Sequence, residues 1–274
     1  MRNEKVKEQI SCPFLIRLPP VRISLQKISK QLIDHQGPYT TVGGNFFAFL
    51  PLPTFSNNTG TISSQAAAQS PGQYLPANTH PSIIAGYAAQ HTLLTQNLPS
   101  SSTADMEFIF GDGTIIPALQ LPFSRGRVLI NSTSAFDSPV IDPRYLSNPL
   151  DLASLVEGFK YARTIRETNA MQQIKVEEVY PGPSVRTDDA IEDFVAGGVS
   201  TENHHSGTTS MLPKDLGGVV DANLTVYGVQ GLRIVDASVV PMLPAAHLQA
   251  TMYAIAEKVR RFTSSERNFL TFLL

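Results

Sequence analysis

The sequence is poor in cysteine, charge and long apolar runs. Cys12 is the only cysteine among 274 residues, which excludes an internal disulfide framework and any metal site built on several thiolates. The formal net charge is only -2 and no basic face is evident, so we expect no nucleic-acid partner. No segment is long and apolar enough to cross a bilayer, so we expect no membrane partner.

Several familiar site patterns are also missing. The nearest approach to the glycine-rich G-x-G-x-x-G run, which seats a dinucleotide pyrophosphate at a helix N-terminus, is Gly111-Asp112-Gly113. It lacks the third glycine and the strand-to-helix context. There is no G-x-S-x-G elbow, which argues against a hydrolase. The short apolar run near Cys12 is broken by a proline and an arginine and has no cleavage site, so it predicts no secretory signal and leaves localisation open.

Three helices are indicated by caps and by apolar spacing. Asn148, Pro149 and Asp151 supply a cap, a proline at the first helical position and an acid in the first turn, which predicts a helix from there. Thr187 predicts the cap of a second helix that stops at Gly197-Gly198. A third helix is expected from about His247, with an apolar face running to Phe262.

The strand and loop expectations come from composition. Residues 106–110, 127–131 and the apolar run ending at Leu50 predict short strands. Residues 57–69 and 96–103 are rich in serine, threonine, asparagine and glutamine, and this composition predicts loops.

The most informative pattern lies near the C-terminus. His204 stands in N-H-H-S-G-T, followed by G-G-V-V-D ending at Asp221, then V-Y-G-V-Q-G-L-R-I-V-D-A-S with Asp236 and Ala237, and finally His247. This ordered run resembles the C-terminal signature of the glucose-methanol-choline (GMC) flavoprotein oxidoreductases, closest to the fungal glucose-oxidase and aryl-alcohol-oxidase branch. A single motif would be weak, but ordered context strengthens it.

The resemblance extends upstream as far as Gln31. Residues 123–128 resemble P-x-S-R-G-x-V, and residues 139–146 resemble P-x-I-D-P-x-Y-L. Residues 31–35 resemble N-L-x-D-H, with Gln31 in place of asparagine. Family members are about twice as long and begin with the glycine-rich unit that this sequence lacks, so the chain resembles their C-terminal half.

The resemblance implies FAD as cofactor and a small-molecule alcohol as substrate, with dioxygen or another acceptor taking the electrons. His204 would be the base, and His247 its partner. Histidine suits that role because its usual pKa is near neutrality. Asp236 and Ala237 would contact the flavin.

Two further flavin contacts are implied, the backbone amides of Leu248 and Gln249 at the start of the last helix. The positive end of that helix dipole would favour a reduced, anionic flavin. The alternative is a purely structural role, in which the two histidines are only buried and hydrogen bonded. A zinc site on His204, His205 and His247 is disfavoured, because no carboxylate or cysteine stands at ligand spacing, so we expect no metal.

The expected fold class is α+β. Residues 1–40 would be an atypical N-terminus with a remnant of the FAD domain. Residues 41–199 would form a substrate domain, an antiparallel sheet with helices on one face. Residues 200–274 would be the C-terminal piece of a Rossmann-like FAD-binding domain, contributing a strand around 232–235 and a helix whose apolar face is exposed or irregularly packed. The competing hypothesis is a non-catalytic remnant that binds no flavin alone.

Overall fold

A computed structural model describes residues 10–11, 14–17, 46–111 and 113–265 of the protein. Cys12, the 31–35 segment and the Gly43-Gly44 turn lie outside these residues. Within the described residues, no helix is both long and apolar enough to span a membrane.

The centre of the molecule is an antiparallel sheet in the order β3-β4-β5-β1-β9, with β2 joining β5 to β8. Its main hairpin pairs β4 with β5, and β3 lies along the other side of β4. The predicted antiparallel sheet is therefore confirmed. The strands are β1 (Ile10–Ser11), β2 (Phe14–Arg17), β3 (Phe46–Leu50), β4 (Met106–Gly111), β5 (Thr114–Leu119), β8 (Glu177–Tyr180) and β9 (Ser200–Thr201). A separate ribbon pairs β6 (Arg127–Leu129) with β7 (Val140–Asp142).

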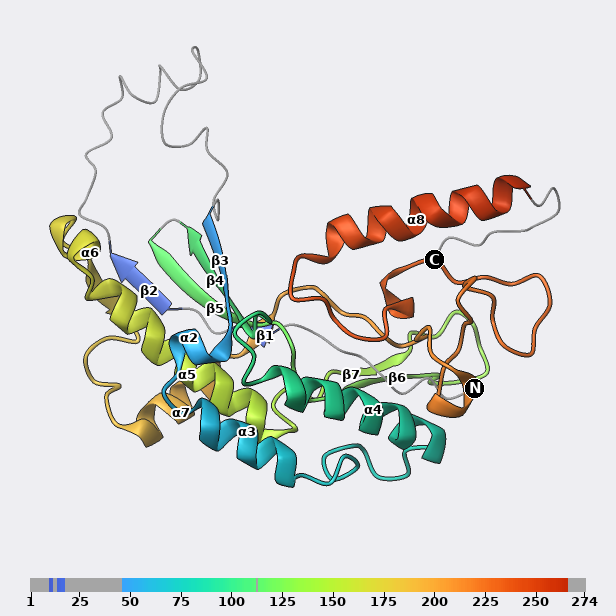
Figure 1. Cartoon of the computed structure of the whole chain (residues 1–274), viewed down its shortest axis with the longest axis horizontal. Helices are drawn as coiled ribbons and strands as arrows, with labels where there is room; N and C mark the ends of the chain where they lie inside the picture. The colour runs from blue at the N-terminus through green and yellow to red at the C-terminus, as the bar shows by residue number, and fades with distance from the viewer. Residues whose placement is uncertain (1–9, 12–13, 18–45, 112, 266–274) are drawn as a thin grey trace, which may run out of the picture.

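Helices cover one face of this sheet. Figure 1 shows α2, α3, α5 and α7 below it, and α8 at the upper right of the view. The α-helices are α2 (Leu52–Phe55), α3 (Thr59–Ala68), α4 (Pro81–Asn97), α5 (Pro149–Arg166), α6 (Asn169–Gln173), α7 (Asp188–Gly198) and α8 (Leu248–Ser265). The core between α5 and the sheet contains Phe108 and Phe159, both fully buried, because the apolar residues of the strands and of the helix face each other there.

The predicted caps explain where two helices begin. The Asn148 side chain accepts from the Leu150 amide at 3.1 Å, and the Thr187 hydroxyl accepts from the Ala190 amide at 3.2 Å. Each satisfies an amide that has no partner inside its helix. The starts predicted for α5, α7 and α8 are confirmed.

The loop predicted over residues 57–69 is wrong, because α3 occupies most of it. Ile62 and Ala66 lie one turn apart and are buried against the core, so packing overrides a composition that favours turns. Helix α4 was not predicted either. His80 caps it and Pro81 is its first residue.

The strand expected over residues 232–235 is also wrong. The described residues give it only an isolated bridge between Thr225 and Arg233, and a strand needs a longer neighbour to pair with. The apolar face of α8 is packed in part, with Ile255 half-buried and Ala256 exposed. Leu248 and Val259 are buried, and Ile255 packs on a second, small core. That core consists of Val220, Leu224, Val226, Val239 and Val259.

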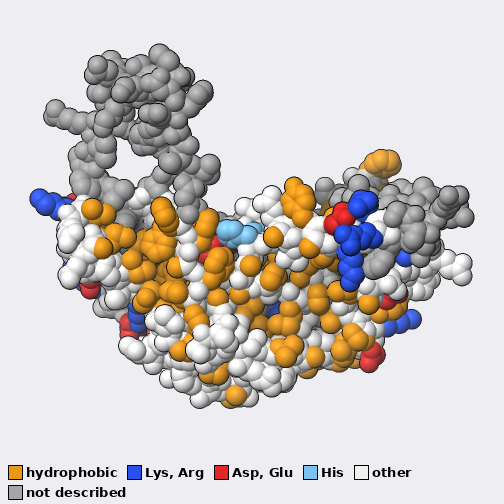
Figure 2. Space-filling model, turned by 45° about the horizontal axis from the view of Figure 1, so that its top comes forward, with side chains coloured by type: hydrophobic (Ala, Val, Ile, Leu, Met, Phe, Trp, Pro, Cys, Tyr) orange, Lys and Arg blue, Asp and Glu red, His pale blue; other side chains and the backbone are white. Residues whose placement is uncertain are grey.

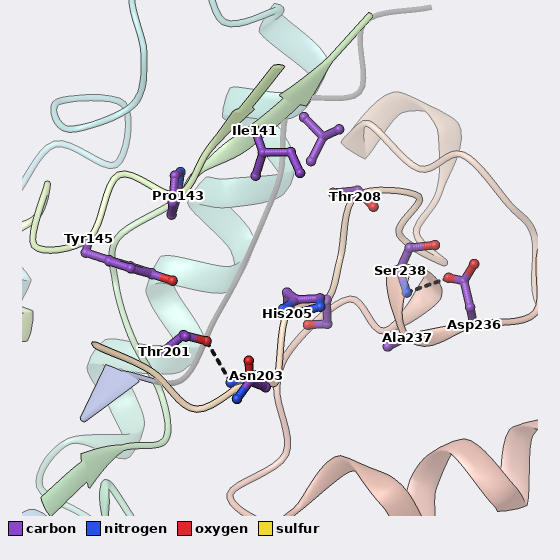
Figure 3. Close-up of a pocket in the computed structure, with 12 residues that line it drawn as sticks. Ile141, Pro143, Tyr145, Thr201, Asn203, His205, Thr208, Asp236, Ala237 and Ser238 are labelled. Atoms are coloured by element: carbon purple, nitrogen blue, oxygen red, sulfur yellow. Dashed lines mark hydrogen bonds between the residues drawn. The ribbon is translucent and has the colours of Figure 1, made fainter. Parts of the chain in front are cut away.

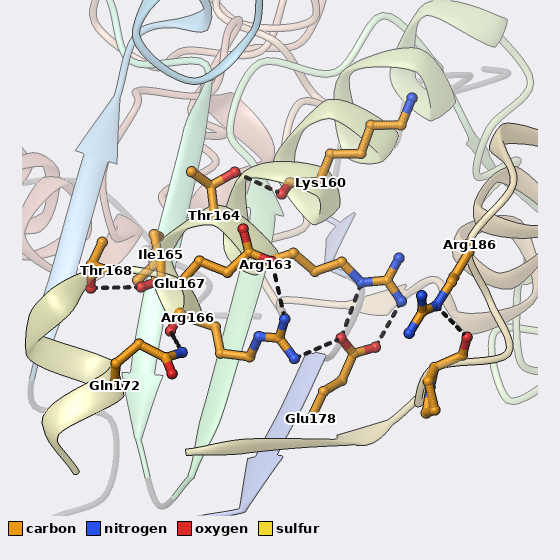
Figure 4. Close-up of polar contacts among 11 residues, drawn as sticks. Lys160, Arg163, Thr164, Ile165, Arg166, Glu167, Thr168, Gln172, Glu178 and Arg186 are labelled. Atoms are coloured by element: carbon orange, nitrogen blue, oxygen red, sulfur yellow. Dashed lines mark hydrogen bonds and ion pairs between the residues drawn. The ribbon is translucent and has the colours of Figure 1, made fainter. Parts of the chain in front are cut away.

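A polar cluster ties α5 to β8 (Figure 4). Glu178 accepts from Arg163 Nε and Nη2 at 3.2 and 2.7 Å, and Arg166 Nη1 lies 3.7 Å from the same carboxylate. The side chain of Glu178 is only 8% exposed, so this bidentate pair is shielded from solvent and holds the strand against the helix.

Candidate active site

Two loops bring the predicted histidine pair together. His204 follows β9, and His247 directly precedes α8. Their ring centroids are 5.7 Å apart, with the ring planes tilted by 47°. Asn203 has a positive φ of 59°, a conformation that asparagine tolerates better than most residues, and it turns the chain just before His204.

A buried carboxylate lies directly against this pair. Nε2 of His247 is 2.7 Å from Oε1 of Glu107, whose side chain is 0% exposed while that of His247 is 44% exposed. An ionised carboxylate can only accept hydrogen bonds. With Glu107 ionised, Nε2 of His247 is therefore the donor, and in a neutral ring Nδ1 is the acceptor.

The surroundings of Glu107 fix its position. Gln120 donates its Nε2 to the other carboxylate oxygen at 3.1 Å. Burial raises the pKa of the Glu107 carboxyl above its usual value, while the hydrogen bond and charge of His247 oppose that shift. The carboxylate is thus held between two fixed partners at the base of the histidine pair.

Aromatic rings surround the other side of His247. The ring of Phe47 lies 4.8 Å from it at 89°, and that of Phe49 lies 5.9 Å away at 68°. Both are edge-to-face contacts, the arrangement that aromatic pairs favour. The rings and the carboxylate together restrict the orientation of His247.

Backbone hydrogen bonds within the motif segments join the His204 loop to the segment that contains Asp236. Three amides of the H-x-x-G-T region, those of Gly207, Thr209 and Met211, donate to carbonyls of residues 237–239. At Gly218, a Cβ atom would stand 1.7 Å from the Leu212 carbonyl oxygen, so only glycine permits this approach. The motif segments that follow one another in the sequence therefore pack together as one folded unit.

Asp236 and Ala237 line a pocket of about 600 Å³ beside this unit (Figure 3). Asp236 accepts from the Ser238 amide at 2.8 Å and so caps the short turn that follows. The buried hydroxyl of Ser206, at the same pocket, forms no hydrogen bond with the described part of the protein. His205 also lines this pocket, whereas His204 and His247 do not.

No group of three histidine, cysteine, aspartate or glutamate side chains in the described ranges is placed to hold a metal ion. His204 and His247 lie together with Glu107, while His205 faces the neighbouring pocket.

Sequence reasoning missed Glu107, Phe47 and Phe49. The one available signal for Glu107 was a lone acid in the otherwise apolar strand M-E-F-I-F. A charged residue at such a place is rarely buried unless it has a partner. Its partner is 140 positions away, so the pairing itself was not visible in the sequence.

Comparisons with known proteins identify the family of this chain. The family model described as GMC oxidoreductase matches residues 122–256. The GMC oxidoreductase family protein Mala s 12 from Malassezia sympodialis is 35% identical over 77% of this chain and 35% of its own length.

Two solved structures share the fold over nearly the whole chain. An FAD-dependent oxidoreductase from Chaetomium thermophilum has a TM-score of 0.89 and 26% identity, covering 98% of this chain and 49% of that one. A fungal aryl-alcohol oxidase has a TM-score of 0.84 and 29% identity, covering 96% and 48%. The chain thus spans about half the length of these structures and about a third of that relative. It belongs to the GMC oxidoreductase family, of which it carries the C-terminal region.

Proposed function

We propose that this chain is the C-terminal half of an FAD-dependent oxidoreductase that oxidises a CH–OH group of a small alcohol. The observation that carries the proposal is the histidine pair, with rings 5.7 Å apart beside a buried carboxylate. The fungal aryl-alcohol oxidase of the same fold acts on alcohols, which supports the substrate class.

His204 takes the proton of the substrate hydroxyl in this proposal. A base with a pKa near neutrality and within hydrogen-bond reach typically contributes ~10²–10⁴-fold to rate. His247 orients the hydroxyl through a hydrogen bond, and Glu107 is a positioning residue that fixes the ring of His247. When bound, FAD supplies the acceptor for the hydride that leaves the CH–OH carbon. Dioxygen or another acceptor then takes the electrons.

The residues present fit the flavin end of FAD. The pocket beside Asp236 and Ala237 measures about 600 Å³ and contains the unsatisfied buried hydroxyl of Ser206, which is a ready hydrogen-bonding group. The amides of Leu248 and Gln249 open α8, and first-turn amides have no partner inside their helix. Asp236, Ala237 and Ser206 line the pocket and would hold the group there. Leu248 and Gln249 are not among its lining residues, and they are proposed to contact the group through their backbone amides. The division into a substrate domain over 41–199 and a flavin-domain piece over 200–274 belongs to the same proposal.

The second candidate is a non-catalytic remnant. It is favoured by one observation, the lack of a G-x-G-x-x-G run anywhere in the 274 residues. That run seats the pyrophosphate in related dinucleotide folds, so this chain alone would lack those contacts.

A chimaera separates the two candidates. It joins this chain to the N-terminal half of the Chaetomium thermophilum oxidoreductase, the part of that structure which this chain does not cover. We expect the purified chimaera to carry FAD and to lose flavin absorbance when mixed with a primary alcohol without oxygen. A flavin-loaded chimaera that no alcohol reduces would support the remnant instead.

A further inference from the structure

A second pocket lies apart from the histidine pair, between the end of α5 and the segment that joins β8 to α7. It measures about 630 Å³ and shares no lining residue with the pocket beside Asp236. Figure 2 shows pale-blue histidine at the base of a hollow, beside hydrophobic side chains. The second pocket, called here the arginine pocket, is lined instead mainly by charged residues, Arg163, Arg166, Arg186, Glu167, Glu177 and Glu178.

Two of the three guanidinium groups are held in place by acids. Arg163 donates Nε and Nη2 to Glu178 and lies over the Phe159 ring, 4.7 Å from its centroid. Since Glu178 takes only these two atoms, the Nη1 donors of Arg163 remain for another acceptor. Arg166 donates Nη2 to Glu167 at 3.1 Å, but its buried Nε has no hydrogen-bond partner in the described part of the chain. A buried donor without an acceptor is costly, so the arginine pocket favours a ligand that supplies acceptor oxygens.

The third guanidinium group has no acid paired with it. Arg186 is exposed, and its Nε donates to the Pro183 carbonyl at 2.7 Å, which fixes the side chain beside the pocket that it lines. Figure 4 shows it reaching toward the Arg163–Glu178 pair from the segment after β8. Among the described residues, no carboxylate forms an ion pair with Arg186. Its two Nη atoms therefore carry donors that a ligand can use.

The charges that face the arginine pocket do not cancel. Glu178 and Glu167 offset the two arginines of α5. The remaining acid, Glu177, borders the pocket and is exposed. It is the neighbour of Glu178 on β8, so strand alternation directs its side chain to the opposite side of the strand. Arg186 therefore leaves one uncompensated positive charge at the pocket.

A single positive charge with spare forked donors suits one carboxylate. Guanidinium groups match the planar, two-oxygen shape of a carboxylate through paired hydrogen bonds. A phosphate group carries about -1.5 to -2 charge at pH 7, and the excess would stand against Glu167 and Glu178. Val176, which is buried, and Pro183 also line the pocket, so a short hydrocarbon chain attached to the carboxylate gains apolar burial.

We propose that the arginine pocket binds the carboxylate of a small organic acid. Arg186 supplies the unpaired charge, and Arg163, held by Glu178, supplies a second oriented donor. Neither histidine of the proposed catalytic pair lines this pocket. It is therefore a second ligand site, which goes beyond the proposed function and does not require flavin.

Ligand-observed NMR on the 274-residue chain tests this proposal with butyrate, a short monocarboxylate, at pH 7. Butyramide is the comparison, because it keeps the size and shape of butyrate but carries no charge. We expect butyrate to bind in the millimolar range, and butyramide and inorganic phosphate to bind more weakly. Arg186→Gln should weaken butyrate binding about 3- to 10-fold, the effect of losing a charged hydrogen bond that solvent partly screens.

Lys175→Gln is the matched control. Lys175 is an exposed cation next to Val176 and is not a lining residue, so the same loss of charge there should leave butyrate binding unchanged. Arg186→Lys keeps the charge without the fork and should lie between the parent and Arg186→Gln. Thermal unfolding of each variant checks that the fold is retained, as expected for exposed positions.

Four outcomes would overturn the proposal: butyramide or phosphate binding as tightly as butyrate, Arg186→Gln leaving butyrate binding unchanged, Lys175→Gln weakening it as much as Arg186→Gln, or no saturable binding at millimolar butyrate. None of these measurements involves flavin reduction by the chimaera, so this proposal and the proposed function can each fail alone.

Discussion

The two histidines are held in different ways. His247 is fixed by the Glu107 carboxylate at 2.7 Å and by two aromatic edges. His204 lies on a loop that turns at Asn203. Its position depends on the backbone amides that donate hydrogen bonds from this loop to residues 237–239. A ring locked by a carboxylate suits orientation of a hydroxyl, so the difference fits a division of roles.

Replacing His247 by asparagine should therefore be the milder change. Asparagine keeps a hydrogen-bonding group but cannot accept a proton at neutral pH. We expect His247→Asn to slow alcohol-dependent flavin reduction in the chimaera by less than about 100-fold, below the typical loss of a general base. Stopped-flow absorbance at equal flavin content measures this. A loss as large as that of His204→Ala would reverse the two roles. His80→Asn, which retains the cap of α4, is the control.

A second residue-scale prediction concerns a buried acid away from the site. Burial raises the pKa of Asp105 to about 7, and the nearby Asp151 adds to the shift while Ser154 opposes it. The folded protein thus binds a proton that an unfolded chain releases near its usual value. The resulting contribution to stability is complete below about pH 4 and is lost as the pH rises through about 7, by up to ~4 kcal/mol.

Asp105→Asn removes this titration. As the pH rises from about 4 to 7, we expect the unfolding free energy of the native protein to fall relative to that of this variant. Urea denaturation at several pH values measures it. The exposed Asp193 on α7 provides the control, Asp193→Asn, for which the difference should stay nearly flat. A pH-independent difference for Asp105→Asn would contradict the assignment.

At the scale of elements, the contact between α5 and β8 depends on one carboxylate. Glu178 serves both Arg163 and Arg166 and is 8% exposed. Glu178→Gln leaves two arginines without their anion, and we expect it to lower the unfolding free energy by about 1–3 kcal/mol. Glu167→Gln removes a pair whose acid is 64% exposed, and should cost less than about 1 kcal/mol. Equal effects in urea denaturation would show that the α5–β8 pair is not shielded as described.

The sequence was a good guide where local chemistry decides an element. Asn148 and Thr187 cap their helices as predicted, because capping needs only neighbouring residues. The α3 helix was missed since its reason is distant packing of Ile62 and Ala66. Leu232–Val235 read as a strand but has no strand neighbour among the described residues.

The site residues also fall into two groups, those that the sequence indicated and those that it did not. The histidines were found because an ordered motif run marked them, and the structure brings them together. Glu107 and Phe47 were not found. Their proximity to His247 comes from the register of β3 and β4 and from where the last loop crosses the sheet, neither of which has a local signal. The catalytic and flavin-contact roles stay predictions.

At the scale of the whole molecule, the chain covers about half of each similar structure. It has a pocket lined by Asp236 and Ala237, which we propose for the flavin end, but no glycine-rich run for the pyrophosphate. The C-terminal part of the chain forms a small core of its own, to which Val259 of α8 contributes.

The isolated 274-residue chain should accordingly bind FAD weakly. We expect no saturation at micromolar FAD when flavin fluorescence is followed, which corresponds to a binding free energy weaker than about -8 kcal/mol. The chimaera serves as the positive control. Micromolar or tighter binding by the chain alone, together with alcohol-dependent bleaching, would show that it is a self-sufficient enzyme.

We propose His204 as the base of an alcohol-oxidising flavoenzyme. Its most direct test is the rate of flavin reduction by benzyl alcohol in the oxygen-free chimaera, compared with the same protein carrying His204→Ala at equal FAD content. We expect His204→Ala to lower the rate by ~10²–10⁴-fold and His80→Asn to leave it unchanged. A rate within a few-fold of the parent would contradict it.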